Sequence, residues 1–278
     1  MTGYIDVGGG MRGIFGAGVL DYFLDEGIKC DYYIGVSAGS ANISSYLAEQ
    51  RGRTYRFYTE YSKRPEYMSF HNFVHKKSYF DLDYVYSELS SPDGEDPLDF
   101  EKFLASAEPF YTVATRASDG KAEYFTRDNF SPDNCDALKA SCTIPGVCIP
   151  RKIGEETYFD GGVADPIPIQ KAIDDGCDQV ILVLTRPIDY NKRPEYFKPI
   201  YSKLLKDYPN IVEGLNNRHI AYNEGIKKAL EFQKEGKVSI IAPSMGYLLT
   251  AFTKSEGTLK NLYDDGYCSA KNLAKKHK

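Results

Sequence analysis

GVSAG stands at residues 35–39 of the chain, between a short apolar run and a helix-like stretch at 40–50. A G-x-S-x-G motif between a strand and a helix is typical of a nucleophile elbow, a sharp turn that exposes a serine hydroxyl. Such a turn strains the backbone at Ser37, and it needs small residues at Gly35 and Gly39 because the strand and the helix pass close to them. The helix N-terminus behind the serine favours negative charge. The motif therefore predicts a nucleophilic serine, although it also occurs by chance in glycine-containing loops.

A second glycine-rich run, GGGMRG, occupies residues 8–13, after a strand-like run at 4–7 and before a helix-like stretch at 14–26. It matches the G-x-G-x-x-G of dinucleotide sites, which also need an acid about 20 residues further on, at the end of the second strand. Asp31 has that offset but begins the strand. We favour an oxyanion hole, because consecutive glycines at a helix N-terminus leave backbone N–H groups open to the negative oxygen of an acyl intermediate. A tight turn that only packs the first helix is the alternative.

The third motif is Asp160-Gly161-Gly162, at the end of a strand-like run that contains Tyr158 and Phe159. An aspartate in this position can act as a base or an orienting group that backbone N–H groups hold in place. Asp-Gly is also an ordinary turn sequence. The motif therefore indicates a catalytic aspartate only in combination with the other two motifs.

In this order the three motifs resemble the patatin-like phospholipase family, whose pattern is a glycine-rich run with an arginine, then G-x-S-x-G, then D-G-[GA]. The resemblance covers residues 4–178, including ASCTIP at 140–145. It implies a catalytic Ser–Asp dyad without a histidine, with Ser37 as the nucleophile and Asp160 as the proton acceptor. One departure is Val7, which stands where family members often have Asp. We expect little consequence, because the chemistry uses the backbone that follows.

The resemblance implies further site residues. The oxyanion-hole backbone falls on Gly9, Gly10 and Met11, and Arg12 supports that loop. No metal and no other cofactor is implied. The remaining glycines of the three motifs are Gly8, Gly13, Gly35, Gly39, Gly161 and Gly162.

A histidine could in principle complete a triad. The order Ser37, Asp160, His219 is that of an α/β-hydrolase triad. His219, however, lies within a helix-like stretch rather than in a loop after a strand, and only one strand precedes the elbow strand, where that fold usually has several. We therefore expect a dyad. The other three histidines are His71 and His75, in an aromatic and basic segment, and His277, in a basic tail.

Composition favours a folded globular protein, since the 278 residues are 42% hydrophobic and 26% charged. The net charge of -5 gives no support for nucleic-acid binding, and no stretch approaches the roughly 20 apolar residues of a membrane span. The N-terminus lacks the positive region of a signal peptide, and the six cysteines show no C-x-x-C pairing. We expect a cytoplasmic protein with reduced thiols, no zinc site and contact with membranes at most at their surface.

Strand-like and helix-like stretches alternate along the chain, which predicts a three-layer α/β/α sandwich with a mostly parallel central sheet. We expect residues 1–278 to form a single domain of patatin-like fold. Besides the elbow and glycine-run elements, strands are expected at 110–115, 122–126, 180–184 and 238–242, with one ending at Asp160, and helices at 100–105, 133–140, 166–176, 199–208, 211–235 and 255–276.

One segment, at about 51–97, interrupts this alternation. Between residues 55 and 86 it holds eleven tyrosines and phenylalanines, interleaved with arginines and lysines that include Lys76 and Lys77. Aromatic side chains with polar tips suit a membrane–water interface, and cations suit anionic headgroups. The segment is therefore either a cap over the site that engages lipid or an inserted helical subdomain whose aromatic side chains pack inward. We favour the second interpretation.

Three functions stay open at this point. The leading one is a serine acyl hydrolase that cleaves carboxylic esters of phospholipids or lysophospholipids. The second keeps the dyad but acts on soluble acyl compounds, as a thioesterase or a general carboxylesterase. The third is a catalytically silent lipid-binding protein of the same fold. The sequence does not decide the acyl position, the headgroup or the oligomeric state.

Overall fold

The sheet at the centre of the molecule is mostly parallel. The computed structural model describes residues 1–244, 250 and 252–276, so His277 and Lys278 lie outside the described residues. Five strands run parallel in the order β3-β2-β1-β7-β8. Their bounds are β1 (Thr2–Asp6), β2 (Tyr32–Val36), β3 (Phe110–Arg116), β7 (Gln179–Val183) and β8 (Val238–Ile241).

Three antiparallel strands extend the sheet on the side of β3. They are β4 (Ala122–Thr126), β5 (Arg151–Ile153) and β6 (Glu156–Asp160). β4 pairs with residues 111–115 of β3 along one edge. Along the other edge, β2 pairs with residues 110–113 and β6 with residues 114–116, so β2 and β6 meet end to end beside β3. β5 forms a hairpin with β6. This arrangement brings two strand ends from distant parts of the sequence together.

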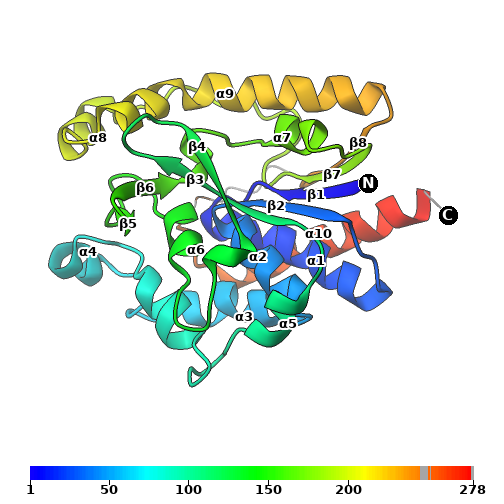
Figure 1. Cartoon of the computed structure of the whole chain (residues 1–278), viewed down its shortest axis with the longest axis horizontal. Coiled ribbons are helices and arrows are strands. Elements are labelled where there is room, and N and C mark those ends of the chain that lie inside the picture. The colour runs from blue at the N-terminus through cyan, green and yellow to red at the C-terminus, as the bar shows by residue number, and fades with distance from the viewer. Residues whose placement is uncertain (245–249, 251, 277–278) are drawn as a thin grey trace.

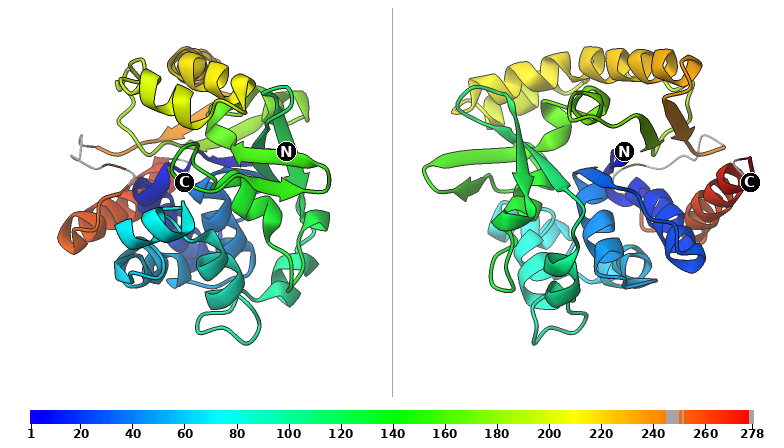
Figure 2. Two further views of the ribbon diagram at one scale, coloured as in Figure 1. Left: turned by 90° about the vertical axis from the view of Figure 1, so that its left-hand side faces the viewer. Right: turned by 45° about the vertical axis from the view of Figure 1, so that its right-hand side comes forward.

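Helices cover both faces of the sheet, as Figures 1 and 2 show. The three-layer fold predicted from the sequence is confirmed. One face carries α1 (Ile14–Glu26), α2 (Ala38–Leu47), α3 (Arg53–Thr59), α5 (Phe100–Ala105), α6 (Asp136–Ser141) and α10 (Glu256–Lys276). The other face carries α7 (Ile169–Asp174) and α9 (Pro209–Lys234), with α8 (Lys198–Leu204) beside α9.

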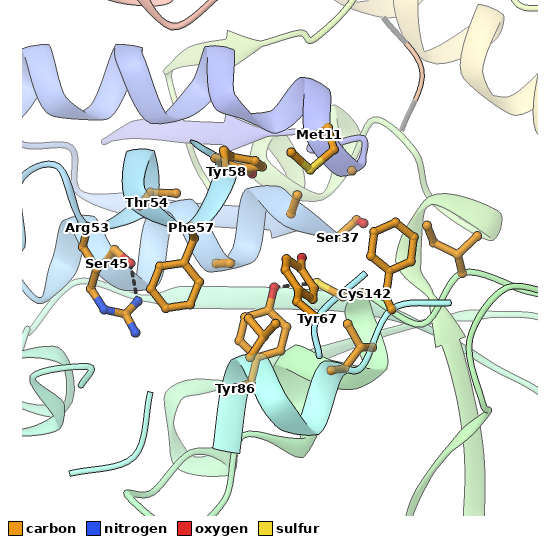
Figure 3. A pocket seen from close by; sticks show the side chains of 17 residues that line it. Met11, Ser37, Ser45, Arg53, Thr54, Phe57, Tyr58, Tyr67, Tyr86 and Cys142 are labelled. Atoms are coloured by element: carbon orange, nitrogen blue, oxygen red, sulfur yellow. Dashed lines mark hydrogen bonds between the residues drawn. The ribbon is translucent and has the colours of Figure 1, made fainter. Parts of the chain in front are cut away.

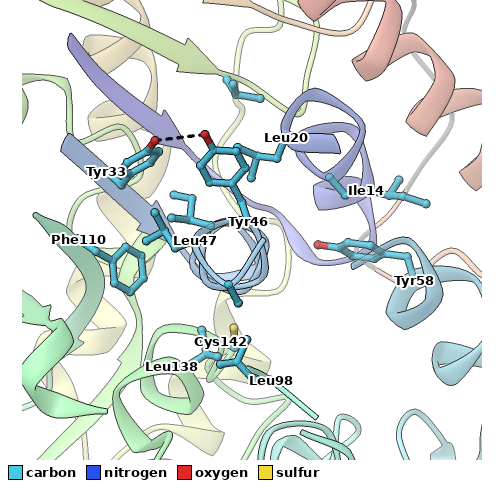
Figure 4. Packing of buried hydrophobic residues seen from close by; sticks show 14 of the residues in the cluster. Ile14, Leu20, Tyr33, Tyr46, Leu47, Tyr58, Leu98, Phe110, Leu138 and Cys142 are labelled. Carbon is cyan, nitrogen blue, oxygen red and sulfur yellow. Dashed lines mark hydrogen bonds between the residues drawn. The ribbon is translucent and has the colours of Figure 1, made fainter. Parts of the chain in front are cut away.

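Two cores follow from the alternation of side chains along the strands. Tyr4 and Tyr33 point to the face of α1 and α2, where they join a large cluster that includes Tyr46 and Leu138 (Figure 4). Ile5 and the neighbouring β2 residues point the other way, toward α7 and α9. All these strand residues are almost fully buried. Apolar side chains on both faces are expected of parallel strands that lie between two helical layers.

Several helix bounds differ from those that the sequence predicts. The elbow helix begins at Ala38 and ends at Leu47, and the helix expected at 199–208 ends at Leu204. The helix expected from 133 begins at Asp136, because Ser131 and Asn134 pair in a tight turn before it. The sequence did not predict β5, which is only three residues long.

The segment at 51–97 consists of short helical pieces. Besides α3, it contains α4 (Phe70–Lys76), a 3-10 turn at 61–63 and a π-helical turn at 84–89. Most of its aromatic side chains are buried or packed against the core beside α1, among them Tyr58, Tyr61 and Phe80. This is the inward packing that the second of the two interpretations expects. Phe70 and Phe73 on α4 are exceptions, since both are exposed.

The last helix, α10, packs against the first helix, α1. There, Tyr263 donates a hydrogen bond to the Asp21 carboxylate (2.7 Å) and Tyr267 donates one to Asp25 (2.9 Å). No helix in the described part of the chain is both long enough and apolar enough to cross a membrane.

Candidate active site

Ser37 stands at the sharp turn between β2 and α2. Its φ of 55° and ψ of -130° are strained for a residue with a side chain, at a cost of order 1–3 kcal/mol. Its backbone N–H donates to the Ser141 hydroxyl (2.8 Å), and its carbonyl accepts from the Ser40 N–H (2.9 Å). Ser37 is only 6% exposed. The hydroxyl therefore faces a cavity rather than open solvent, contrary to the exposure that the motif predicts, because the segment at 51–97 and the glycine loop cover it.

The small residues of the elbow are needed because three elements pass close together. A Cβ on Gly39 would lie 2.2 Å from the carbonyl oxygen of Asp6 in β1, and one on Gly35 would lie 2.4 Å from the Cα of Ser40. Real Cβ atoms do not approach other atoms so closely, so any larger residue would push β1, β2 and α2 apart. This is the close passage that the sequence pattern predicts.

The glycine run lies directly against this turn. Gly8, Gly9 and Gly10 have φ values of 61°, 120° and 59°, all in the region that favours glycine. Gly8 touches the elbow itself, since a Cβ on it would lie 2.2 Å from the carbonyl oxygen of Val36 and 2.9 Å from the N atom of Ala38. Within the described residues, the N–H groups of Gly9 and Gly10 have no hydrogen-bond acceptor. The loop thus presents free backbone donors beside Ser37.

We expect Gly8→Ala to lower the free energy of unfolding by more than about 3 kcal/mol, because it combines a strained φ with a backbone collision. Gly27→Ala is the matched control. Gly27 has a similar φ of 65°, but no atom of the described residues lies within 4 Å of the added Cβ, so the loss is about 1 kcal/mol. Urea denaturation of both variants measures the difference. Equal losses would mean that the contact of Gly8 with the elbow contributes nothing.

A buried acid holds the glycine loop, and the sequence analysis missed it. Asp6 is fully buried and accepts hydrogen bonds from the Gly8 N–H (2.9 Å) and from the Asn42 amide (2.9 Å). Asn42 also donates to the carbonyl of Gly13 and accepts from the Tyr58 hydroxyl. Burial raises the pKa of Asp6 to about 6, although both of its donors lower it. Its position two residues before the glycine run was the signal that could have revealed it.

Asp160 approaches Ser37 from β6, a strand that runs in the direction opposite to β2. It ends β6, and its pairing partner Ala114 directly follows Val113, the partner of Val36 at the end of β2. Its N–H donates to the carbonyl of Thr143 (2.8 Å), and its carboxylate accepts from the Gly162 N–H (2.8 Å). Since Ser141 holds the backbone of Ser37, the stretch at 141–143 fixes both residues.

The electrostatics of Asp160 suit a base. The side chain is buried, and burial raises the pKa of the Asp160 carboxyl, while the charge of Arg218, the Ser37 hydroxyl and the Gly162 N–H lower it. Arg218 comes from α9 and donates from Nε to the carbonyl of Gly162 (2.7 Å). No local sequence motif predicts that Arg218 belongs to the site, because α9 begins about fifty residues after Asp160.

Ser37 and Asp160 line one cavity of about 470 Å³, together with the glycine run and Arg12. The Arg12 guanidinium lies against Gly9, about 3.0 Å from where a Cβ on that residue would be. His219 does not line the cavity, although it lies next to Arg218 on α9. His71 and His75 pack on one another on α4, with ring centroids 4.2 Å apart.

A second, apolar pocket adjoins the same serine (Figure 3). It is narrow, at about 60 Å³, and Ser37 and Gly10 line both this pocket and the larger cavity. Most of its wall comes from the segment at 51–97, which contributes Arg53, Thr54, Phe57, Tyr58, Tyr67, Phe80, Leu82, Val85 and Tyr86. Met11 and Cys142 also line the pocket near the serine.

Other candidate ligands in the sequence lie elsewhere. Asp31, the residue considered for a ribose, directly precedes β2 at the end opposite Ser37, and its carboxylate accepts a hydrogen bond from the N–H of Thr2 (2.6 Å). In the part of the chain that the structure describes, no three His, Cys, Asp or Glu side chains gather as metal ligands.

Two family models match the chain. The model described as patatin-like phospholipase matches residues 7–173, and a domain of unknown function, DUF6363, matches residues 208–278. The first range contains the elbow, the glycine run and Asp160. The second contains α9, β8 and α10.

Individual relatives share part of the chain. The uncharacterized protein YjjU of Escherichia coli K12 is 32% identical over 198 residues, which are 69% of this chain and 54% of that protein. The uncharacterized NTE family protein Rv1063c of Mycobacterium tuberculosis H37Rv is 33% identical over 75 residues, 27% of this chain and 20% of that protein. The chain thus spans about half the length, or less, of these curated relatives.

Among solved structures, VipD from Legionella pneumophila aligns with a TM-score of 0.47 and 12% identity, covering 99% of this chain and 67% of that one. This likeness is too weak to support an argument. The family model, by contrast, matches more than half of the chain and includes all three motifs. The chain belongs to the patatin-like phospholipase family.

Proposed function

We propose that the protein is a serine acyl hydrolase that cleaves carboxylic ester bonds of phospholipids or lysophospholipids. One observation supports this most directly. A strained serine, a buried carboxylate and backbone N–H groups without an acceptor among the described residues surround a single cavity, and an apolar pocket opens at the same serine. These are the groups that acyl transfer needs, in positions from which they can act on one ester.

The reaction begins with attack by Ser37. As its Oγ bonds to the ester carbonyl carbon, Asp160 accepts the hydroxyl proton, and its burial makes it a stronger base than an exposed carboxylate. The proton then passes to the leaving alcohol as the ester C–O bond breaks. In the second half, water attacks the acyl-enzyme, Asp160 accepts the proton of the water, and Ser37 recovers it as the acid leaves.

The glycine loop stabilises the charge that develops on the carbonyl oxygen. The N–H groups of Gly9 and Gly10, which have no acceptor in the described part of the chain, are the donors that suit this role, and the Asp6 carboxylate fixes the loop through Gly8. Loss of one such donor typically costs about 2.7–4 kcal/mol of transition-state stabilisation.

The apolar pocket supports an acyl chain as the group that enters beside Ser37. Its wall is mostly aromatic and aliphatic, and burial of each methylene contributes about 0.8 kcal/mol. This favours lipids over small soluble esters and thioesters, which remain the alternative substrates. A chain-length series of p-nitrophenyl esters beside phospholipid micelles separates them, because a lipid hydrolase gains rate with chain length and acts on the micelles.

Labelling with a fluorophosphonate tests the proposal itself. The reagent forms a covalent bond with an activated serine, so we expect the wild-type protein to be labelled at Ser37 and to lose hydrolysis of lysophospholipid in proportion. A protein that takes no label and hydrolyses no ester would instead be a silent lipid-binding member of the family.

Contact with a membrane surface belongs to the same proposal. Two helices, α4 and α8, lie at the end of the molecule where β1 and β2 finish, as Figures 1 and 2 show, and both carry exposed apolar side chains. α8 lines the cavity itself, so a lipid could pass from a bilayer into the site. The exposed side chains are Phe70, Phe73 and Val74 on α4, and Phe197, Ile200 and Leu204 on or next to α8. Lys76, by contrast, is held in an ion pair with Asp81.

We expect the double variant Phe70→Ser and Phe73→Ser to bind lipid vesicles at least ten-fold more weakly, because each phenyl ring contributes about 1.5–3 kcal/mol when buried. Co-sedimentation with phosphatidylcholine vesicles measures the loss. Leu104→Ser is the control, since Leu104 is also exposed but lies on α5, away from this end. Equal binding by both variants and the wild type would exclude α4 as a lipid contact.

A further inference from the structure

The cavity that contains Ser37 is positively charged although the chain as a whole is not. Among the described residues, the lining has four cations, Arg12, Arg186, Lys192 and Arg218, and two carboxylates, Asp160 and Glu195. Four positive and two negative charges leave a surplus of two positive charges, whereas the net charge of the chain is -5. A local excess of this kind inside a cavity attracts anions.

Two of the four cations have carboxylates nearby. Lys192 forms an ion pair with Glu195 (2.9 Å), and Arg218 lies close enough to Asp160 to lower the pKa of that carboxyl. Arg12 and Arg186 have no carboxylate within 4 Å among the described residues. The Nε of Arg12 is buried and has no hydrogen-bond acceptor there either. Arg186 stacks its guanidinium 4.7 Å over the ring of Tyr190.

Holding these cations together is unfavourable without an anion. Burial, together with the charges of Arg186 and Arg218, lowers the pKa of Arg12 to about 10. Burial and the charge of Arg218 likewise lower the pKa of Lys192. A buried donor that lacks an acceptor and cations that repel one another are both stabilised when an anionic oxygen group enters between them.

We propose that Arg12, Arg186 and Arg218 form a subsite that binds the phosphate group of the substrate. Arginine is suited to this role, because its planar fork of donors matches phosphate oxygens two at a time. As a substrate subsite it rests on the function proposed above. It gives these residues the recognition of the phosphate that phospholipids and lysophospholipids carry, and it disfavours neutral acylglycerols with the same chain.

The subsite also gives a role to the C-terminal part of the chain. Arg186 lies after β7 and Arg218 lies on α9, both outside the residues 7–173 that the patatin-like model matches. Arg218 falls within residues 208–278, the match to the domain of unknown function, which also adds Leu215 and Tyr222 to the cavity wall. This region therefore completes the site rather than forming a separate unit of the molecule.

The test compares two esters that differ only in the phosphate, an octanoyl lysophosphatidic acid and octanoylglycerol, both below micellar concentrations. We expect the wild type to favour the phosphate ester at least ten-fold in kcat/KM. Arg186→Gln should reduce this ratio about ten-fold, the usual effect of losing one hydrogen bond between charged groups. Arg186→Lys should retain part of it. Arg193→Gln removes the same charge from an exposed residue outside the cavity and should leave the ratio unchanged.

A binding measurement separates this inference from the proposed function. Calorimetry with glycerol 3-phosphate should show binding to the wild type that is stronger than binding of inorganic phosphate and is weakened about ten-fold in Arg186→Gln. If both esters are hydrolysed at equal rates, the subsite is wrong and the hydrolase stands. If neither is hydrolysed but glycerol 3-phosphate binding depends on Arg186, the anion site stands and the hydrolase is wrong.

Discussion

Ser37→Ala is expected to reduce hydrolysis of lysophospholipid by about 10⁵-fold or more, because removal of the nucleophile of an acyl-transfer enzyme removes the covalent pathway as a whole. The loss should appear in kcat, with KM little changed, since the Ser37 side chain is small and the substrate is held by the walls of the two cavities. Initial rates and fluorophosphonate labelling, measured on the same preparations, check both parts.

Ser44→Ala is the matched control for this variant. Ser44 lies on α2, the helix that follows Ser37, is also buried, and donates a hydrogen bond to the carbonyl of Ser40 rather than to a cavity group. It should keep wild-type activity and labelling. If Ser37→Ala retained more than a few per cent of the activity while remaining folded, Ser37 would not be the nucleophile.

The sequence predicted the part of the site that is local. The elbow and the glycine run each follow a strand directly, and β1 and β2 are parallel neighbours, so general rules for parallel sheets bring their ends together. The continuous apolar run at 180–184 likewise predicted a strand that is buried on both faces, and the structure has β7 there, at Gln179–Val183.

The sequence could not show what depends on distant pairing. The meeting of β6 with β2 follows from the register of both against β3, which no local pattern encodes. Asp6 becomes a structural acid only because Asn42, 36 residues away, turns its amide toward it. Arg186 and Arg218 enter the cavity from elements that read as an ordinary strand end and a polar helix face.

The segment at 51–97 was hard to predict for another reason. Its pieces are short, and none shows a regular apolar period over more than two turns. Its aromatic side chains suit both a membrane interface and a core. Packing decides between these: Tyr58 bonds to Asn42 behind the glycine loop, and Phe80 packs beside Tyr67 in the apolar pocket.

Asp160→Asn is expected to lower kcat by about 10⁴-fold, since it removes the base but preserves the shape of the side chain. The amide oxygen can still accept the Gly162 N–H, so the turn after β6 should keep its conformation. His219→Ala should retain most of the activity, because His219 does not line the cavity. The pair distinguishes a Ser–Asp dyad from a triad, in which both variants would be inactive.

The pH dependence of activity and of folding stability provides an independent test, because the expected direction of each change is known. Burial raises the pKa of Asp160 above its ordinary value of 3.8, and activity requires the ionised form, so wild-type activity should fall as the pH drops through the raised pKa. The contribution of this group to folding stability has the opposite pH dependence. A raised folded-state pKa contributes stability below the unfolded pKa that is lost as the pH rises through the folded one.

Asp160→Asn removes that titration. It should therefore raise the melting temperature relative to the wild type at neutral pH, with a smaller difference near pH 4, while kcat falls. Thermal unfolding at both pH values and rates at neutral pH measure the two effects together. An inactive variant that is also less stable than the wild type at neutral pH would mean that Asp160 has a structural role and is not the buried base that accepts the Ser37 proton.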